Sequence, residues 1–266
     1  MHVFLGLFSS LLIHDGVSLE AIEIDCASES NFTRGHSSEV NGVTSVGYRR
    51  PADGASLSIG GGAVPESRDP LIVWKEQTLS MQLDLRSRTL KQSPSGWAIG
   101  DRSVWWPGTG SVRCQAMAGR FYVSASIGYR GLGARGNVSW LKSDPNGDIE
   151  LLEGAVRHAI ARLNCQRFGI GPNVTVNSRV VAGTLRDGDS RIFVPLSAWA
   201  QARGISLTRN ARLGSTTFAY AEKAVILLLG TDDCKVNNQR RSLGAMLVRK
   251  GNEWYAPLNG IEDTIR

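Results

Sequence analysis

Apolar side chains recur with helical spacing over residues 148–165, which is the clearest periodic pattern in the chain. The apolar positions are Leu152, Ala155, Val156, Ala159, Ile160 and Leu163. Intervals of three and four residues place them on one face of an α-helix. Asp148 is the expected N-cap, and Glu150 and Glu153 lie in the early turns, where carboxylates interact favourably with the helix dipole. The pattern predicts one main amphipathic helix, with His158 on a solvated side.

A second, short helix is predicted between Pro195 and Gly204. Proline favours the first position of a helix, and glycine is common just beyond the last one.

Most other apolar segments alternate with a period of two or are short and β-like, which is typical of strands. They are residues 71–74, 79–85, 112–118, 121–127, 205–209, 216–220, 224–229, 243–250 and 253–256. Gly119-Arg120 and Gly251-Asn252 each leave a two-residue turn between strands, which predicts two hairpins. The expected fold class is therefore α+β, mostly antiparallel β-sheet with one main helix at about 148–165 and a short second helix.

The apolar stretch of residues 3–13 is about the length of a secretory signal core and too short to span a bilayer. We interpret residues 1–21 as an export signal that is cut after Ala21; the competing interpretation is a buried N-terminal strand or helix. Residues 22–70 are rich in Ser, Gly, Asn and Asp, end near Gly60-Gly61-Gly62, and are predicted to be loop-rich. Residues 71–266 are predicted to form one α+β domain without an internal repeat; the alternative is a division into two lobes near Asp144.

Four cysteines follow the predicted cleavage point: Cys26, Cys114, Cys165 and Cys234. An even number in an exported chain permits two disulfides, whose pairing the sequence leaves open. Their spacing is not that of a metal site, so no metal is predicted. The expected location is periplasmic or extracellular. A cytosolic protein with free thiols is the competing interpretation.

The formal net charge of +6 favours an acidic partner, which we take to be an acidic envelope polymer or a partner protein. The basic residues are scattered and form no dense run, so no nucleic acid is expected. No other apolar stretch approaches twenty residues, and the mature chain is predicted to have no transmembrane segment.

Motifs for catalysis or cofactor binding are weak. Residues 131–138 read G-x-G-x-x-G-x-V, but a strand-like segment follows where a dinucleotide site requires a helix, so no cofactor is predicted. There is no G-x-S-x-G motif. Once residues 1–21 are removed, only His36 and His158 could act as histidine bases. A secreted hydrolase with a non-standard active site is therefore the alternative function.

The most distinctive local feature is Trp105-Trp106. Neighbouring side chains of a strand point to opposite faces, so one indole could be exposed beside Arg102 and stack on a planar ligand. With Arg120, these residues form the candidate ligand-binding surface. The competing interpretation is that residues 27–70 cover the outer indole. The predicted function is that of an exported binding or accessory protein of unspecified ligand.

Overall fold

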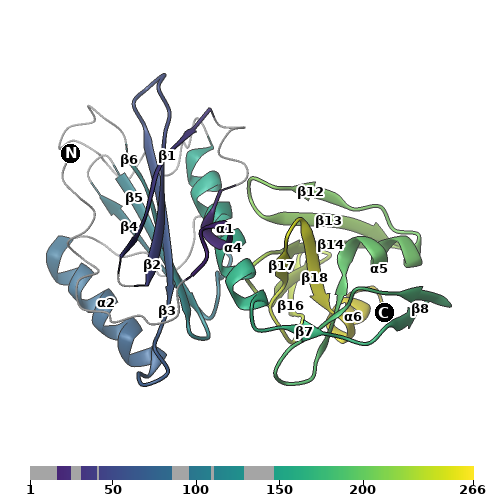
Figure 1. Ribbon diagram of the computed structural model, residues 1–266. Coiled ribbons are helices and arrows are strands. Elements are labelled where there is room, and N and C mark those ends of the chain that lie inside the picture. The colour runs from purple at the N-terminus through teal and green to yellow at the C-terminus, as the bar shows by residue number, and fades with distance from the viewer. Residues whose placement is uncertain (1–16, 25–30, 41, 86–95, 109–110, 129–146) are drawn as a thin grey trace.

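The computed structural model describes residues 17–24, 31–40, 42–85, 96–108, 111–128 and 147–266. Helices accompany sheets in which every pair of named strands is antiparallel, which confirms the α+β class. Two units lie side by side with helix α4 (Asp148–Cys165) between them (Figure 1). None of the described helices is both long enough and apolar enough to cross a membrane.

The N-terminal unit is built on a six-stranded sheet with the order β1-β2-β3-β6-β5-β4. Its strands are β1 (Thr33–Val40), β2 (Val43–Arg49), β3 (Ser56–Ala63), β4 (Arg102–Gly108), β5 (Ser111–Ala118) and β6 (Phe121–Gly128). The hairpin predicted at Gly119-Arg120 is confirmed, with Ala118 opposite Phe121 and Gly119 at a φ of 55°. The prediction that residues 22–70 are loop-rich is wrong, because they supply half of this sheet.

The glycine cluster that suggested a loop lies inside strand β3. A Cβ on Gly61 would stand 2.9 Å from Cγ2 of Ile22 and 3.3 Å from the carbonyl oxygen of Tyr122. Only a residue without a side chain lets the short helix α1 (Leu19–Ile22) pack this close to the sheet. Glycine here marks a close approach of two elements instead of a turn.

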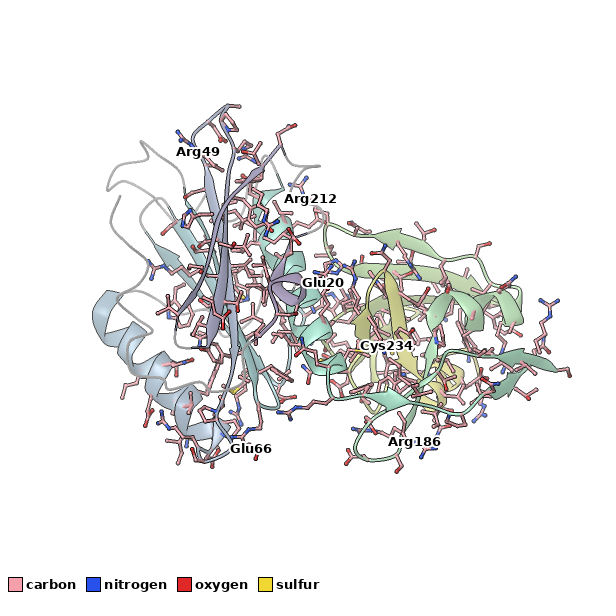
Figure 2. The ribbon with its side chains drawn as sticks, viewed as in Figure 1. Glu20, Arg49, Glu66, Arg186, Arg212 and Cys234 are labelled. Atoms are coloured by element: carbon pink, nitrogen blue, oxygen red, sulfur yellow. The ribbon has the colours of Figure 1, made fainter. Side chains whose placement is uncertain are left out.

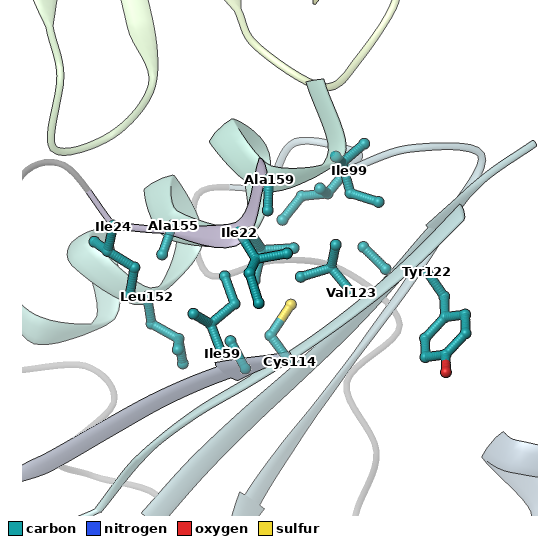
Figure 3. Packing of buried hydrophobic residues seen from close by; sticks show 14 of the residues in the cluster. Ile22, Ile24, Ile59, Ile99, Cys114, Tyr122, Val123, Leu152, Ala155 and Ala159 are labelled. Atoms are coloured by element: carbon teal, nitrogen blue, oxygen red, sulfur yellow. The ribbon is translucent and has the colours of Figure 1, made fainter. Parts of the chain in front are cut away.

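Helices cover both faces of the sheet (Figures 1 and 3). Helices α1 and α4 pack on one face, where Ile22, Cys114 and Val123 meet, whereas the Tyr122 side chain points to the other face. Helix α2 (Pro70–Leu85) lies on that other face, where the Gln115 amide donates a hydrogen bond to its Gln77.

Helix α2 replaces the two strands expected at 71–74 and 79–85, which is an error in our prediction. The backbone N–H of Leu71 donates to Asp69 Oδ1 at 2.7 Å, and Pro70 is the first helical residue. An aspartate cap followed by proline is a helix start signal. It outweighs the β-like alternation that follows.

Residues 17–24 are part of the folded core. Val17, Ala21, Ile22 and Ile24 are buried, and the Thr44 hydroxyl donates a hydrogen bond to the Val17 carbonyl oxygen. A cut after Ala21 would remove Val17 and Ala21 from this core. This burial bears only on the position of the cut; residues 1–16, with the apolar stretch that suggested an export signal or a buried N-terminal strand or helix, lie outside the described residues.

The C-terminal unit contains two five-stranded sheets, ordered β17-β18-β11-β10-β7 and β12-β13-β14-β15-β16, and the hairpin β8-β9. The strands of the first are β7 (Gly169–Ile170), β10 (Leu185–Arg186), β11 (Ile192–Pro195), β17 (Val248–Lys250) and β18 (Glu253–Pro257). Those of the second are β12 (Thr208–Asn210), β13 (Ser215–Tyr220), β14 (Lys223–Leu228), β15 (Asp233–Val236) and β16 (Gln239–Ser242). The hairpin strands are β8 (Val174–Val176) and β9 (Arg179–Val181), and the helices are α5 (Leu196–Arg203) and α6 (Leu258–Ile265). The second predicted helix and the hairpin at Gly251-Asn252 are confirmed.

An internal repeat, which the sequence analysis did not find, organises this unit. Hairpins β8-β9 and β15-β16 each turn on two residues with positive φ, Asn177-Ser178 and Asn237-Asn238. Each is followed by a strand pair and then by an eight-residue helix capped by proline. The two capping prolines have nearly the same backbone conformation, with φ and ψ of −57° and 122° at Pro195 and −61° and 124° at Pro257.

The two repeats meet at strands β11 and β18. Val194 lies opposite Ala256 at the centre of this antiparallel pair, with Phe193 opposite Pro257 and Pro195 opposite Tyr255. This register relates the two copies by an approximate two-fold axis through the centre of the strand pair.

Helix α4 has the predicted bounds but not the predicted exposure. Gly147, in a left-handed conformation, precedes it as the N-cap, and Asp148 is its first residue. Its apolar side packs on the N-terminal sheet, whereas strand β17 packs against another side. His158, expected to be solvated, is only 7% exposed. The helix is buried on most sides because it fills the space between the two units.

Candidate functional site

Neither indole of the predicted ligand-binding surface is exposed. Trp105 lies opposite Cys114, which faces helix α4, and Trp106 lies opposite Arg113 on the other face of the sheet. The two side chains point to opposite faces, as expected, but each is about 1% exposed. Within the described part of the chain, neither indole N–H finds a hydrogen-bond acceptor. The prediction that one indole contacts a ligand at the surface is therefore wrong for this structure.

The two arginines of that surface have separate surroundings. The Arg120 guanidinium donates to the carbonyl oxygens of Val64, Pro65 and Arg68, and so it closes the turn that leads to helix α2. Arg102 is exposed on edge strand β4. Of the four predicted residues, Arg102 alone is open to solvent.

The described cysteines are free. Cys114, Cys165 and Cys234 are buried and form no disulfide with one another, and Cys26 lies outside the described residues. Burial raises the pKa of the Cys114 thiol well above its usual value and the pKa values of Cys165 and Cys234 to about 11. No two of these three disulfide candidates are joined, because each sulfur is packed within its own part of the core.

His158 is held by both ring nitrogens. Nε2 is 2.8 Å from the carbonyl oxygen of Ala211, to which it donates, and Nδ1 accepts from the Arg249 guanidinium at 2.7 Å. The ring also meets Trp254 edge to face, with the ring centroids 5.9 Å apart. A histidine in this arrangement has no free nitrogen for a substrate proton, so the geometry does not support His158 as the base of a hydrolase. His36, the other histidine considered, is exposed on strand β1.

Helix α4 carries two buried ion pairs. Asp148 accepts two hydrogen bonds from Arg50, at 2.8 and 2.7 Å, and Arg50 also binds Asp53. The Arg50 hydrogen bond holds the pKa of the Asp53 carboxyl below its usual value. One turn further along, Glu153 accepts from Arg157 at 2.7 Å, with both side chains almost fully buried.

Arg157 joins the two units through residues 96–101, which we call the connecting segment. Its guanidinium donates to the carbonyl oxygen of Ala98 in this segment and to that of Leu229 in the C-terminal unit. The backbone N–H of Gly100 donates to the carbonyl oxygen of Gly230. Arg212, labelled in Figure 2, comes from the C-terminal unit and donates to the carbonyl oxygen of Gly147, the N-cap of helix α4, at 3.1 Å. The buried charges of helix α4 therefore position the units relative to each other.

At the start of the connecting segment, one indole contacts two cations. Lys235 Nζ is 4.7 Å and Arg240 Cζ is 5.3 Å from the centroid of the Trp97 ring, and Arg240 also donates a hydrogen bond to the Gly96 carbonyl oxygen. We call Trp97, Lys235 and Arg240 the Trp97 cluster. Neither of its cations is in an ion pair with any carboxylate of the described residues.

The two cations belong to a row of side chains that crosses a whole sheet. Residues directly opposite each other on neighbouring strands project from the same face. The successive partners, from strand β12 to strand β16, are Thr208, Thr217, Ile226, Lys235 and Arg240. Thr208, Thr217 and Arg240 are exposed, whereas the adjacent row on the other face is buried at its three central positions, Thr216, Leu227 and Cys234. The sheet thus presents one solvated face with hydroxyls at one end of the row and cations at the other.

A signal for this arrangement was present in the sequence. Lys235 and Arg240 flank Val236-Asn237-Asn238-Gln239 symmetrically, and an Asn-Asn pair is compatible with a two-residue hairpin turn. Pairing outward from that turn places Lys235 opposite Arg240. The contact with Trp97, more than a hundred residues earlier in the chain, had no such signal.

Comparison with known families matches residues 175–266 to the copper amine oxidase N-terminal domain. The match covers about a third of the chain and includes nearly all of both copies of the internal repeat. No curated protein and no solved structure matches the chain. The C-terminal unit is thus similar to a domain that occurs at the N-terminus of another class of protein.

The copper in that family name belongs to the oxidase. Residues 175–266 contain no histidine and a single cysteine, Cys234, which is buried. Among the residues that the structure describes, no group of three or more His, Cys, Asp or Glu side chains could hold a metal ion. Copper sites in proteins use imidazole and thiolate ligands, so the residues of this unit do not fit a copper site.

Proposed function

We propose that this chain is an exported accessory protein that binds an acidic polymer of the cell envelope through the solvated face of its C-terminal unit. The observation that carries this proposal is the row across strands β12–β16, which ends in two cations without a carboxylate partner among the described residues. A positive surface without internal counter-charges attracts polyanions. The net charge of +6 acts in the same direction.

The similarity of residues 175–266 to an N-terminal domain supports an accessory role. The geometry of His158, with both nitrogens engaged, gives no support to the alternative of a hydrolase that uses this residue as its base.

Binding is tested with the purified full chain on columns of polygalacturonate, an acidic polysaccharide, and of dextran, a neutral one. We expect retention on polygalacturonate alone, and elution at high salt because exposed ion contacts are screened. Equal behaviour on both columns would contradict the binding proposal.

Export is tested on the protein recovered from its native cells. Cell fractionation should place it outside the cytoplasm, and intact mass should show that residues at the N-terminus have been removed. The mass also decides between a cut after Ala21 and retention of residues 17–21, which the burial of Val17 and Ala21 favours. A cytoplasmic protein that keeps Met1 would contradict export.

A further inference from the structure

We infer that the Trp97 cluster is an oxyanion site, in which Lys235 and Arg240 together bind a carboxylate, sulfate or phosphate group of a glycan, and in which Trp97 is a positioning residue. This inference rests on the proposed function and names the site and the chemical group through which the polymer is bound.

The first argument is the unfavourable placement of two like charges. Lys235 and Arg240 are direct cross-strand partners in the pair β15-β16. Like charges at such positions destabilise a sheet. The Trp97 ring offsets part of this cost, because the face of an indole attracts cations. An anion held between the two side chains would offset the rest.

The second argument concerns the donors that remain. Arg240 uses one terminal nitrogen for the Gly96 carbonyl oxygen, and a guanidinium has five N–H donors in a planar fork. Lys235 has an ammonium with three donors, and its only described interaction is with the Trp97 ring. The planar guanidinium of Arg240 and the ammonium of Lys235 can together donate hydrogen bonds to the oxygens of one carboxylate, sulfate or phosphate group.

The third argument is that Trp97 fixes the geometry before a ligand arrives. The indole is itself only 7% exposed, so a sugar ring cannot stack on it while both cations remain in place. Its role is instead to hold two flexible side chains at one position, which lowers the entropic cost of binding.

The row beside the cluster favours a glycan over other polyanions. Neighbouring strands lie about 4.8 Å apart, so the row from Thr208 to Arg240 spans about 19 Å. Along it, two threonine hydroxyls and the Ile226 side chain continue the surface that begins at the cations. A hydroxyl-rich chain with spaced acidic groups matches this sequence of contacts.

The two acidic residues just before Lys235 in the chain do not fill the site. Asp233 lies two residues from Lys235 on the same strand and forms no ion pair with it within the described structure. Asp232 accepts a hydrogen bond from the Ser242 hydroxyl at 2.9 Å. These carboxylates lie at the Asp233 end of strand β15 and disfavour an anion there, which directs a bound polymer toward the threonines.

The test compares the double variant Lys235→Gln/Arg240→Gln with a control that loses the same charge elsewhere, Arg186→Gln/Lys250→Gln, both of whose residues are exposed. Isothermal titration uses trigalacturonate, a sulfated glucan oligomer and inorganic phosphate as separate probes. We expect the site variant to bind trigalacturonate or the sulfated oligomer about tenfold more weakly than wild type, while the control stays within about twofold.

Each outcome has one meaning. Equal losses in both double variants would show that net charge alone is responsible and would overturn the site. Tight binding of inorganic phosphate with no binding of either glycan probe would overturn the glycan assignment. Retention of the wild type and of the site variant alike on polygalacturonate would overturn the site but leave the proposed function standing, whereas no retention of wild type would overturn the proposed function.

A further readout separates a ligand site from a structural contact. Trp97→Phe keeps a ring under the cations and should weaken binding less than Trp97→Ala, with the thermal midpoint of each variant measured alongside. Saturating trigalacturonate should raise the midpoint of wild type but not that of Lys235→Gln/Arg240→Gln. Two results together would assign the cluster to folding alone. Without ligand, the double variant would melt several degrees below wild type, and trigalacturonate would not raise the midpoint of wild type.

Discussion

At the scale of single residues, the buried pair Glu153–Arg157 shows how a charged side chain can hold two units together. Arg157 donates to Glu153, to Ala98 and to Leu229, so one guanidinium satisfies acceptors from three parts of the chain. Burial lowers the pKa of this guanidinium, and the adjacent Glu153 carboxylate opposes the shift. Removing any one of these partners would therefore leave a buried polar or charged group without its hydrogen bond, which destabilises the fold.

Replacing Arg157 by methionine should lower the free energy of unfolding by about 3–5 kcal/mol, because it leaves the Glu153 carboxylate buried without a counter-charge. Urea unfolding measures the change. The double variant Glu153→Leu/Arg157→Met is the control and should recover much of the loss, since it buries no unpaired charge. An Arg157→Met protein within about 1 kcal/mol of wild type would contradict the role given to this residue.

The buried cysteines predict slow thiol chemistry. In a Cys26→Ala background, three thiols should react with a disulfide reagent only after unfolding, because Cys114, Cys165 and Cys234 are buried. A count below three after unfolding would show that a disulfide forms.

The same thiols make the stability of the folded state depend on pH. The pKa values of Cys165 and Cys234 rise from 9.0 to about 11 on folding, so the folded state keeps protons that the unfolded state has lost. This contribution to stability is complete below pH 9 and is lost as the pH rises toward 11. Urea unfolding of the Cys26→Ala protein should show that its free energy of unfolding falls between pH 9 and pH 11. Adding Cys165→Ala or Cys234→Ala should make this fall smaller.

At the scale of elements, periodicity identified those segments whose partners lie close in the sequence. Helix α4, helix α5 and the hairpin β5-β6 were predicted because spacing and turn residues determine them locally. Strands β1–β3 were missed because their serine and glycine positions reflect packing against distant elements, as at Gly61. Helix α2 was mistaken for strands, although Asp69-Pro70 is a start signal that could have corrected the assignment.

The predicted binding surface failed for a related reason. Alternation along a strand correctly placed the Trp105 and Trp106 indoles on opposite faces, but it carries no information on what covers each face. Helices lie on both faces of this sheet, and both indoles are buried. The sequence around a strand does not show which distant element will cover each of its faces.

The N-terminal element provides a prediction at this scale. A chain that lacks residues 1–21 should be about 2–4 kcal/mol less stable than one that lacks residues 1–16, because it loses the buried side chains of Val17 and Ala21 and the hydrogen bond from Thr44. Urea unfolding of both truncations isolates the effect of residues 17–21. Equal stabilities would show that these residues are dispensable and would favour the cleavage predicted after Ala21.

At the scale of the whole molecule, the internal repeat escaped notice because its copies share geometry more than residues. Phe193-Val194-Pro195-Leu196 and Tyr255-Ala256-Pro257-Leu258 agree in pattern and retain only the Pro-Leu pair. Strands β12–β14 separate the copies and hide their period. The repeat nevertheless builds one continuous sheet through the pair β11-β18, so the C-terminal unit forms its core from both copies together.

The two units should unfold in a single transition, although each has a core of its own. Helix α4 supplies apolar side chains to the N-terminal core and Ala161 to the other, so unfolding of either unit exposes one side of this helix. The buried contacts of Arg157 and His158 would lose their partners at the same time. Calorimetry should therefore give one peak whose calorimetric and van't Hoff enthalpies agree, with coincident urea transitions by far-UV circular dichroism and by tryptophan fluorescence. Two resolved peaks would show that helix α4 belongs to one unit only, and that the ion pairs on its surface do not link the cores.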